Sequence, residues 1–188
     1  LTYRQNECFG TYFYTSSLKD ITIDGTRRGR TCHLFVLSLD NHGDKTDTSE
    51  RFVLTRKNDT TWTGVWQDNN RKKLQVHLTL SKQPYASIRR SLFTYAIDST
   101  VKRGKYVIEF YHTVQSPAFG VRITAGPDKA IVKKINNLLY SQLIDNAEGY
   151  CTCTNSYRTS EFSSALTYFF INDHVMSVVT ETAFDCGG

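Results

Sequence analysis

The sequence predicts a β-rich α+β fold, in which an antiparallel β-meander precedes a domain with one main helix and a β-hairpin. Three observations predict it: apolar residues alternate with polar ones over Leu74–Leu80, aromatic and β-branched runs recur between turn signals, and the segment 128–146 has helical spacing. Because turn signals recur every 8–12 residues or so, the meander is expected to form a barrel or a sandwich.

The predicted meander domain covers residues 1–85. An aromatic run, Gly10–Tyr14, begins it, and the alternating strand Leu74–Leu80 ends it. Asp24-Gly25 and Asn41–Asp44 have the composition of turns, so we expect hairpin connections there.

The second predicted domain covers residues 86–188. It begins with a strand over Tyr106–Val114 and continues with the helix over 128–146, whose apolar residues recur three and four positions apart. Phe162–Ile171 and Val175–Ala183 are rich in aromatic and β-branched residues and flank a short polar turn, which predicts a β-hairpin.

The net charge of the chain is modest, at +5 with an isoelectric point near 8.9. Its Lys and Arg residues form short clusters beside turn signals, where solvated charges are common, rather than one basic element. This distribution predicts no nucleic-acid partner, although a weak peripheral attraction to anionic cell-envelope surfaces fits it.

No apolar run reaches the roughly 20 residues that span a bilayer. Because the first residue is Leu1 rather than Met, we expect that a leader has been removed.

The positions of the five cysteines bear on whether the protein is exported to an oxidising compartment. Cys8 and Cys32 lie in the first half of the chain, and Cys151, Cys153 and Cys186 lie near its end. This split predicts one disulfide in each half, Cys8–Cys32 and Cys186 with Cys151 or Cys153, and hence an exported protein. The alternative is a set of reduced thiols packed as small apolar side chains. The single residue between Cys151 and Cys153 does not fit a zinc site, so no metal or other cofactor is expected.

Catalytic motifs are missing from the sequence. There is no nucleophile elbow, and no two histidines lie within four residues of each other. The carboxylates that could act on a glycan, Glu50, Glu109, Glu161 and Glu181, are scattered along the chain. An envelope hydrolase that uses Glu109, Glu181 or His174 therefore remains the alternative to a binding protein.

Aromatic side chains are the candidate ligand-binding residues. Trp62 and Trp66 lie four residues apart on one face of a predicted strand, with Gly64 between them as a slot. Together with Tyr12 and Tyr14 they could stack on sugar rings or grip a protein partner. The alternative is that the tryptophans form the core of the meander domain. The predicted hairpin over 162–183 is a second candidate contact surface.

Two stretches resemble known families. Gly10–Leu80 resembles small β-domains of exported bacterial proteins, in which a Gly-x-Tyr-x-Tyr strand begins a meander and a Gly-x-Trp followed by an alternating strand ends it. Here these motifs are Gly10–Tyr14, Gly64–Trp66 and Leu74–Leu80.

Residues Ile131–Gly188 resemble the start of the extracytoplasmic domain shared by bacterial peptidoglycan-deacetylase accessory regions and lysozyme-sensing anti-sigma factors. The resemblance is carried by Ile135-Asn136, the hairpin over Phe162–Thr182, and Asp185–Gly188. It implies an α+β fold, a periplasmic or secreted location, and sensing or binding without catalysis. In the family pattern an Ala-His pair follows the two glycines, so we expect a C-terminal continuation or a second fragment as a partner.

Together these observations predict an exported, non-catalytic binding module of the cell envelope. Its expected partner is a protein or a cell-wall glycan.

Overall fold

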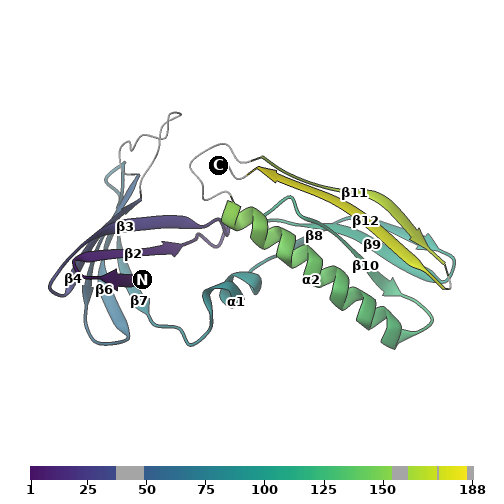
Figure 1. The fold of residues 1–188 in the computed structure, drawn as a ribbon, viewed down its shortest axis with the longest axis horizontal. Helices are drawn as coiled ribbons and strands as arrows, with labels where there is room; N and C mark the ends of the chain where they lie inside the picture. The colour runs from purple at the N-terminus through teal and green to yellow at the C-terminus, as the bar shows by residue number, and fades with distance from the viewer. Residues whose placement is uncertain (37–48, 154–160, 173, 186–188) are drawn as a thin grey trace. The chain divides into compact units, whose positions relative to one another are not determined.

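The computed structural model describes residues 1–36, 49–153, 161–172 and 174–185. Within them the chain is β-rich, with three antiparallel sheets, one long helix and one short helix (Figure 1). This confirms the predicted fold class. In chain order the elements are β1 Thr2–Arg4, β2 Glu7–Tyr12, β3 Ile21–Arg28, β4 Thr31–Val36, β5 Glu50–Arg56, β6 Thr61–Asp68, β7 Lys73–Thr79, α1 Tyr85–Arg90, β8 Tyr95–Arg103, β9 Tyr106–Thr113, β10 Phe119–Ala125, α2 Lys129–Cys153, β11 Glu161–Ile171 and β12 Met176–Asp185.

The chain divides into two compact units. Unit 1 consists of Leu1–Tyr14 and Asp20–Tyr85, and unit 2 consists of Thr15–Lys19 and Ala86–Gly188. The short segment between β2 and β3 therefore belongs to the second unit, although strands of the first unit flank it.

Unit 1 is a meander. Its strands pair in chain order from β1 to β7, and every neighbouring pair is antiparallel. In the described part of unit 1 all the strands belong to one sheet, which rules out a sandwich of two sheets there. The sheet curls far enough for Tyr3 of β1 to stack on Trp62 of β6, with ring centroids 5.5 Å apart.

Two glycines lie where the backbone of the neighbouring strand leaves no room for a side chain. A Cβ atom on Gly25 would lie 1.8 Å from the carbonyl oxygen of His33, and one on Gly64 would lie 1.8 Å from that of Val53. Only a residue without a side chain fits such an approach. The predicted turn at Asp24-Gly25 is therefore wrong, because Gly25 lies inside β3. The predicted turn at Asn41–Asp44 lies outside the described residues.

The core of unit 1 fills the inside of the curl. The strand register places alternate residues of β2 to β6 on this face, and those that are buried together are Cys8, Ile23, Cys32, Leu34, Leu54 and Trp62. Period-two alternation is what brings these distant residues onto one surface.

Unit 2 combines a three-stranded sheet of order β10-β9-β8, the helix α2 and the hairpin β11–β12. Helix α2 packs against β10 and also contacts β12 (Figure 1). It extends to Cys153, beyond the predicted end at residue 146, because its buried stripe continues through Ala147 and Cys151. The predicted hairpin is present, and at its turn the Asn172 side chain accepts hydrogen bonds from the amides of His174 and Val175.

Side chains cover the outer edge of β10. The Asn136 amide of α2 donates to the Ile123 carbonyl at 2.8 Å and accepts from the Ile123 amide at 2.9 Å. On the same edge, the Phe119 amide donates to the Ser164 hydroxyl of β11 at 3.3 Å. These three backbone groups of an edge strand are thus satisfied by side chains rather than by a further strand.

Among the helices of the described residues, none is both long enough and apolar enough to cross a membrane.

Candidate functional site

One carboxylate of unit 1 gathers three aromatic side chains. The Oε2 atom of Glu50, the first residue of β5, accepts hydrogen bonds from the hydroxyls of Tyr12 and Tyr14, each at 2.6 Å. It also accepts one from the indole nitrogen of Trp66. We call Tyr12, Tyr14, Glu50, Phe52 and Trp66 the Glu50 cluster.

The elements of unit 1 explain how these residues meet. Glu50 and Phe52 alternate onto the inner face of β5, and the register places Phe52 directly opposite Trp66 of β6. Tyr12 ends β2, and its ring meets Phe52 edge-on with centroids 5.4 Å apart. The curl of the sheet lets β2 reach β5 across two intervening strands. Tyr14 follows β2 and packs edge-on against Tyr12 at 5.5 Å.

The two phenols of the cluster are held in their neutral form. Burial, followed by the hydrogen bond to Glu50, raises the pKa of Tyr12 above its usual value. The same causes raise the pKa of Tyr14. Both hydroxyls therefore remain donors to Glu50 at neutral pH, and the carboxylate orients the rings.

The cluster is accessible from one side. Tyr14 is 42% exposed, and Tyr12, Glu50 and Trp66 are half-buried. Directly across the strand pair from Glu50 lies a second carboxylate, Asp68. Within the described residues, no Lys or Arg forms an ion pair with either carboxylate.

The structure separates the predicted ligand-binding residues into two groups. Tyr12, Tyr14 and Trp66 meet at Glu50, whereas Trp62 is only 7% exposed and belongs to the core. The slot predicted at Gly64 is filled, because the backbone of Val53 occupies that space. Trp62 is therefore a core residue, as the alternative prediction had it, and a ligand could not reach it.

Sequence reasoning missed the role of Glu50, which it treated as one of several scattered carboxylates. A signal was present, because Glu50 is in phase with Phe52 and Leu54 on an apolar strand face. An acidic residue at such a position needs hydrogen-bond donors if it is buried.

The cysteines do not form the predicted disulfide of unit 1. Cys8 and Cys32 are free thiols, both fully buried in the core, where they pack as small apolar side chains. Cys151 is a buried free thiol near the end of α2, whereas Cys153, which is also buried, is disulfide-bonded. Cys186 lies outside the described residues.

The residues of the hydrolase alternative, Glu109, Glu181 and His174, lie on separate elements of unit 2. Glu109 Oε2 accepts a hydrogen bond from Arg122 Nε at 2.7 Å and lies 2.6 Å from Arg122 Nη2, so its charge is paired with that of the guanidinium. Glu181 and His174 are exposed, one on β12 and one at the hairpin turn. In the part of the chain that the structure describes, no group of three His, Cys, Asp or Glu side chains could hold a metal ion. The side chain of Glu161 is not among those described.

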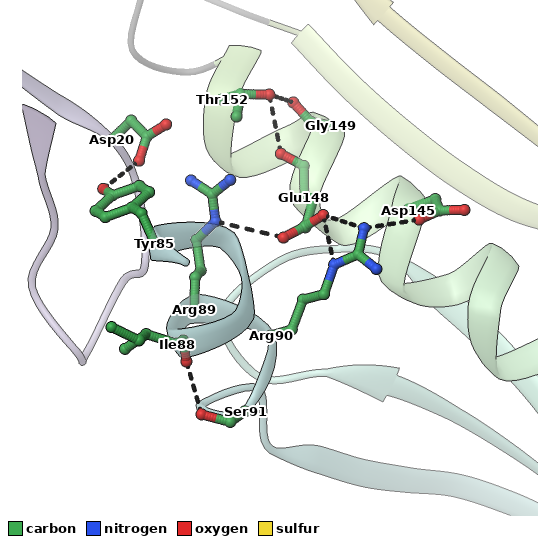
Figure 2. Close-up of polar contacts among 10 residues, drawn as sticks. All are labelled: Asp20, Tyr85, Ile88, Arg89, Arg90, Ser91, Asp145, Glu148, Gly149 and Thr152. Atoms are coloured by element: carbon green, nitrogen blue, oxygen red, sulfur yellow. Dashed lines mark hydrogen bonds and ion pairs between the residues drawn. The ribbon is translucent and has the colours of Figure 1, made fainter. Parts of the chain in front are cut away.

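A second polar cluster joins α1 to α2 within unit 2 (Figure 2). Arg90 contacts Glu148 at 2.6 Å and Asp145 at 3.2 Å. Arg89 is only 4% exposed, and its Nε atom faces Glu148 Oε1 at 3.9 Å. Both arginines point toward one carboxylate of α2 and hold the short helix against it, although the Arg90 side chain stays half exposed.

The hairpin of unit 2 presents an exposed apolar strip. Tyr168, Phe170 and Val179 are 52%, 41% and 45% exposed, and the register places Tyr168 opposite Val179. These residues lie in the second predicted contact surface.

No known protein family, curated protein or solved structure matches this chain.

Proposed function

We propose that this chain is an exported binding or sensing module of the cell envelope that acts without catalysis, with a glycan or a protein as its ligand. The observation that carries the proposal is the Glu50 cluster, in which one carboxylate oxygen orients three aromatic side chains. Rings held in place lose little conformational entropy when a ligand stacks on them. A fixed aromatic surface beside an acid suits a ligand with both apolar and polar faces, such as a sugar.

The periplasmic or secreted location is supported by the resemblance of Ile131–Gly188 to extracytoplasmic sensing domains. The free thiols of Cys8 and Cys32 do not support export, since reduced cysteines need no oxidising compartment. The disulfide-bonded Cys153 does support it.

Binding to isolated cell-wall glycan tests the proposal. The full chain is mixed with insoluble cell-wall material, and the fraction that sediments is measured over a range of glycan concentrations. Replacing Tyr14 with Ala removes the most exposed ring of the cluster, and we expect affinity to fall about tenfold, as for an aromatic residue at the centre of a binding surface.

The matched control is Tyr168→Ala, which removes a ring of similar exposure from the hairpin of unit 2. It should leave binding unchanged. If Tyr168→Ala weakens binding and Tyr14→Ala does not, the site lies on the hairpin instead. If neither cell-wall glycan nor any envelope protein binds the chain, the proposed function is wrong.

A further inference from the structure

We propose that the Glu50 cluster recognises an amino sugar through its free, protonated amine. This inference depends on the proposed binding function and names the chemical group that the cluster selects.

The first step of the argument is the hydrogen bonding of Glu50. All three donors of the cluster reach the same oxygen, Oε2. Among the described residues, no donor reaches Oε1, and this atom is not among the buried polar atoms left without a partner. A carboxylate so held has one oxygen that orients the rings and a second that can accept from a ligand.

The second step is the charge around the cluster. Only neutral groups donate to Glu50, and its cross-strand partner is Asp68, another carboxylate. Like charges directly opposite each other on a strand pair destabilise a sheet. Asp68 accepts a hydrogen bond from the Lys72 backbone amide, which leaves its charge uncompensated by any cation among the described residues. A ligand cation placed between the two carboxylates would relieve this repulsion.

The third step is the aromatic surroundings. Tyr12, Tyr14 and Trp66 point their hydroxyl and indole N–H groups at the same carboxylate oxygen, which fixes the position of the acid. An ammonium group at this site would therefore meet a carboxylate that is already oriented. The partly exposed Tyr14 ring additionally offers a flat surface on which the apolar face of a sugar can stack. A lysine side chain has no such face. This favours an amino sugar over a lysine of a protein partner.

The experiment compares tetraglucosamine with its fully N-acetylated counterpart, which has the same length but no charge. Both are titrated into the full chain at one ionic strength and at a pH at which the sugar amine is protonated. Binding is followed by tryptophan fluorescence. Trp66 lies in the cluster and Trp62 is buried, so a change in emission on binding is assigned to Trp66. We expect the chain to bind the amine form about fivefold more tightly, as for one charge contact at a partly exposed site.

Glu50→Gln keeps the side-chain shape and an acceptor for the phenols but removes the charge, and it should abolish this preference. Asp68→Asn should reduce it about twofold while keeping the hydrogen bond to Lys72, and it serves where Glu50→Gln folds poorly. Asp59→Asn is the matched control, because it removes a negative charge from the exposed β5–β6 turn of the same unit. It should leave the preference intact.

Equal binding of the two sugars, or an unchanged preference in Glu50→Gln, would overturn the inference and leave the proposed function standing. If neither sugar binds but a lysine-rich peptide shifts Trp66 fluorescence in a manner that Glu50→Gln abolishes, the amine belongs to a protein and the amino sugar is wrong. Failure of both sugars and of the peptide, together with no binding to cell-wall material, would remove the proposed function as well.

Discussion

Gly25 and Gly64 show that a glycine in a sequence can indicate either a turn or a close approach of two strands. Beside Asp24, Gly25 has the composition of a hairpin turn, yet it lies within β3, where the neighbouring strand leaves no room for a side chain. The turn that follows β3 uses Gly29 instead, at a φ of 60°. Local composition indicates that glycine is needed at a position, but only the neighbouring strand shows whether the reason is a turn or a close approach.

Replacing Gly64 with Ala tests the close approach. The added methyl group would meet the Val53 carbonyl, so strands β5 and β6 would have to separate, at a cost of about 3 kcal/mol in the free energy of unfolding. Gly29→Ala is the control in the same unit, since its Cβ would meet nothing within 4 Å. It should cost only about 1 kcal/mol, from its left-handed backbone. Urea unfolding followed by tryptophan fluorescence measures both, and equal losses would contradict the steric account.

Cys8 makes the free energy of unfolding of unit 1 fall as the pH rises through the alkaline range. Burial, helped by the contact with Cys32, raises the pKa of Cys8 from its ordinary 9.0 to about 12. Below pH 9 the thiol is protonated in both states, and its contribution to stability is complete. Between pH 9 and 12 the unfolded thiol ionises while the folded one does not, so stability falls by about 1.4 kcal/mol per pH unit.

The measurement is the free energy of unfolding of the wild type and of Cys8→Ala over this range of pH. Other groups, including the phenols, also titrate there, so the difference between the two proteins isolates Cys8. The wild type should lose stability more steeply than Cys8→Ala. Parallel curves would show that the folded protein does not hold this thiol in its neutral form.

At the scale of elements, the packing of α2 depends on polar contacts that periodicity does not reveal. Its helical spacing was readable, whereas its contacts with β10 through Asn136 and with α1 through Glu148 join residues far apart in the chain. Helix α1 itself was missed, because six residues are too few to display a period.

Removing Glu148 should loosen α1 from α2. Glu148→Ala takes away the carboxylate that faces the buried Arg89 and the partner of Arg90, and we expect unit 2 to lose about 3 kcal/mol. Asp145→Ala removes an acid whose side chain is 61% exposed, so it should cost less than about 1 kcal/mol. Unfolding monitored at 222 nm, where α2 dominates the signal, compares the two. Similar costs would mean that burial does not strengthen the Glu148 contacts.

At the scale of the whole molecule, Leu18 ties a short N-terminal segment to unit 2. It is completely buried and adopts a left-handed backbone with a φ of 55°, which a Leu accepts only where packing compensates. The segment Thr15–Lys19 belongs to unit 2 together with Ala86–Gly188. Unit 2 is therefore not continuous in sequence.

We expect Leu18→Ala to destabilise unit 2 by about 3 kcal/mol through the cavity that it leaves. Both tryptophans of the chain lie in unit 1, and the 25-residue helix α2 lies in unit 2. The midpoint of unfolding at 222 nm should therefore fall while that of tryptophan fluorescence stays. The exposed Leu80 of unit 1 provides the control, and Leu80→Ala should move neither midpoint. An equal fall of both midpoints in Leu18→Ala would show that the units unfold as one.

The sequence by itself determined the fold class, the main helix, the hairpin and part of the meander, because each depends on a local period of side chains. It also identified Tyr12, Tyr14 and Trp66 as candidate residues. Only the tertiary structure decided that these three meet at Glu50 and that Trp62 is buried. The physical reason is the curl of the sheet: alternation states which residues share a face, but the degree of coiling decides which members of that face touch across non-neighbouring strands.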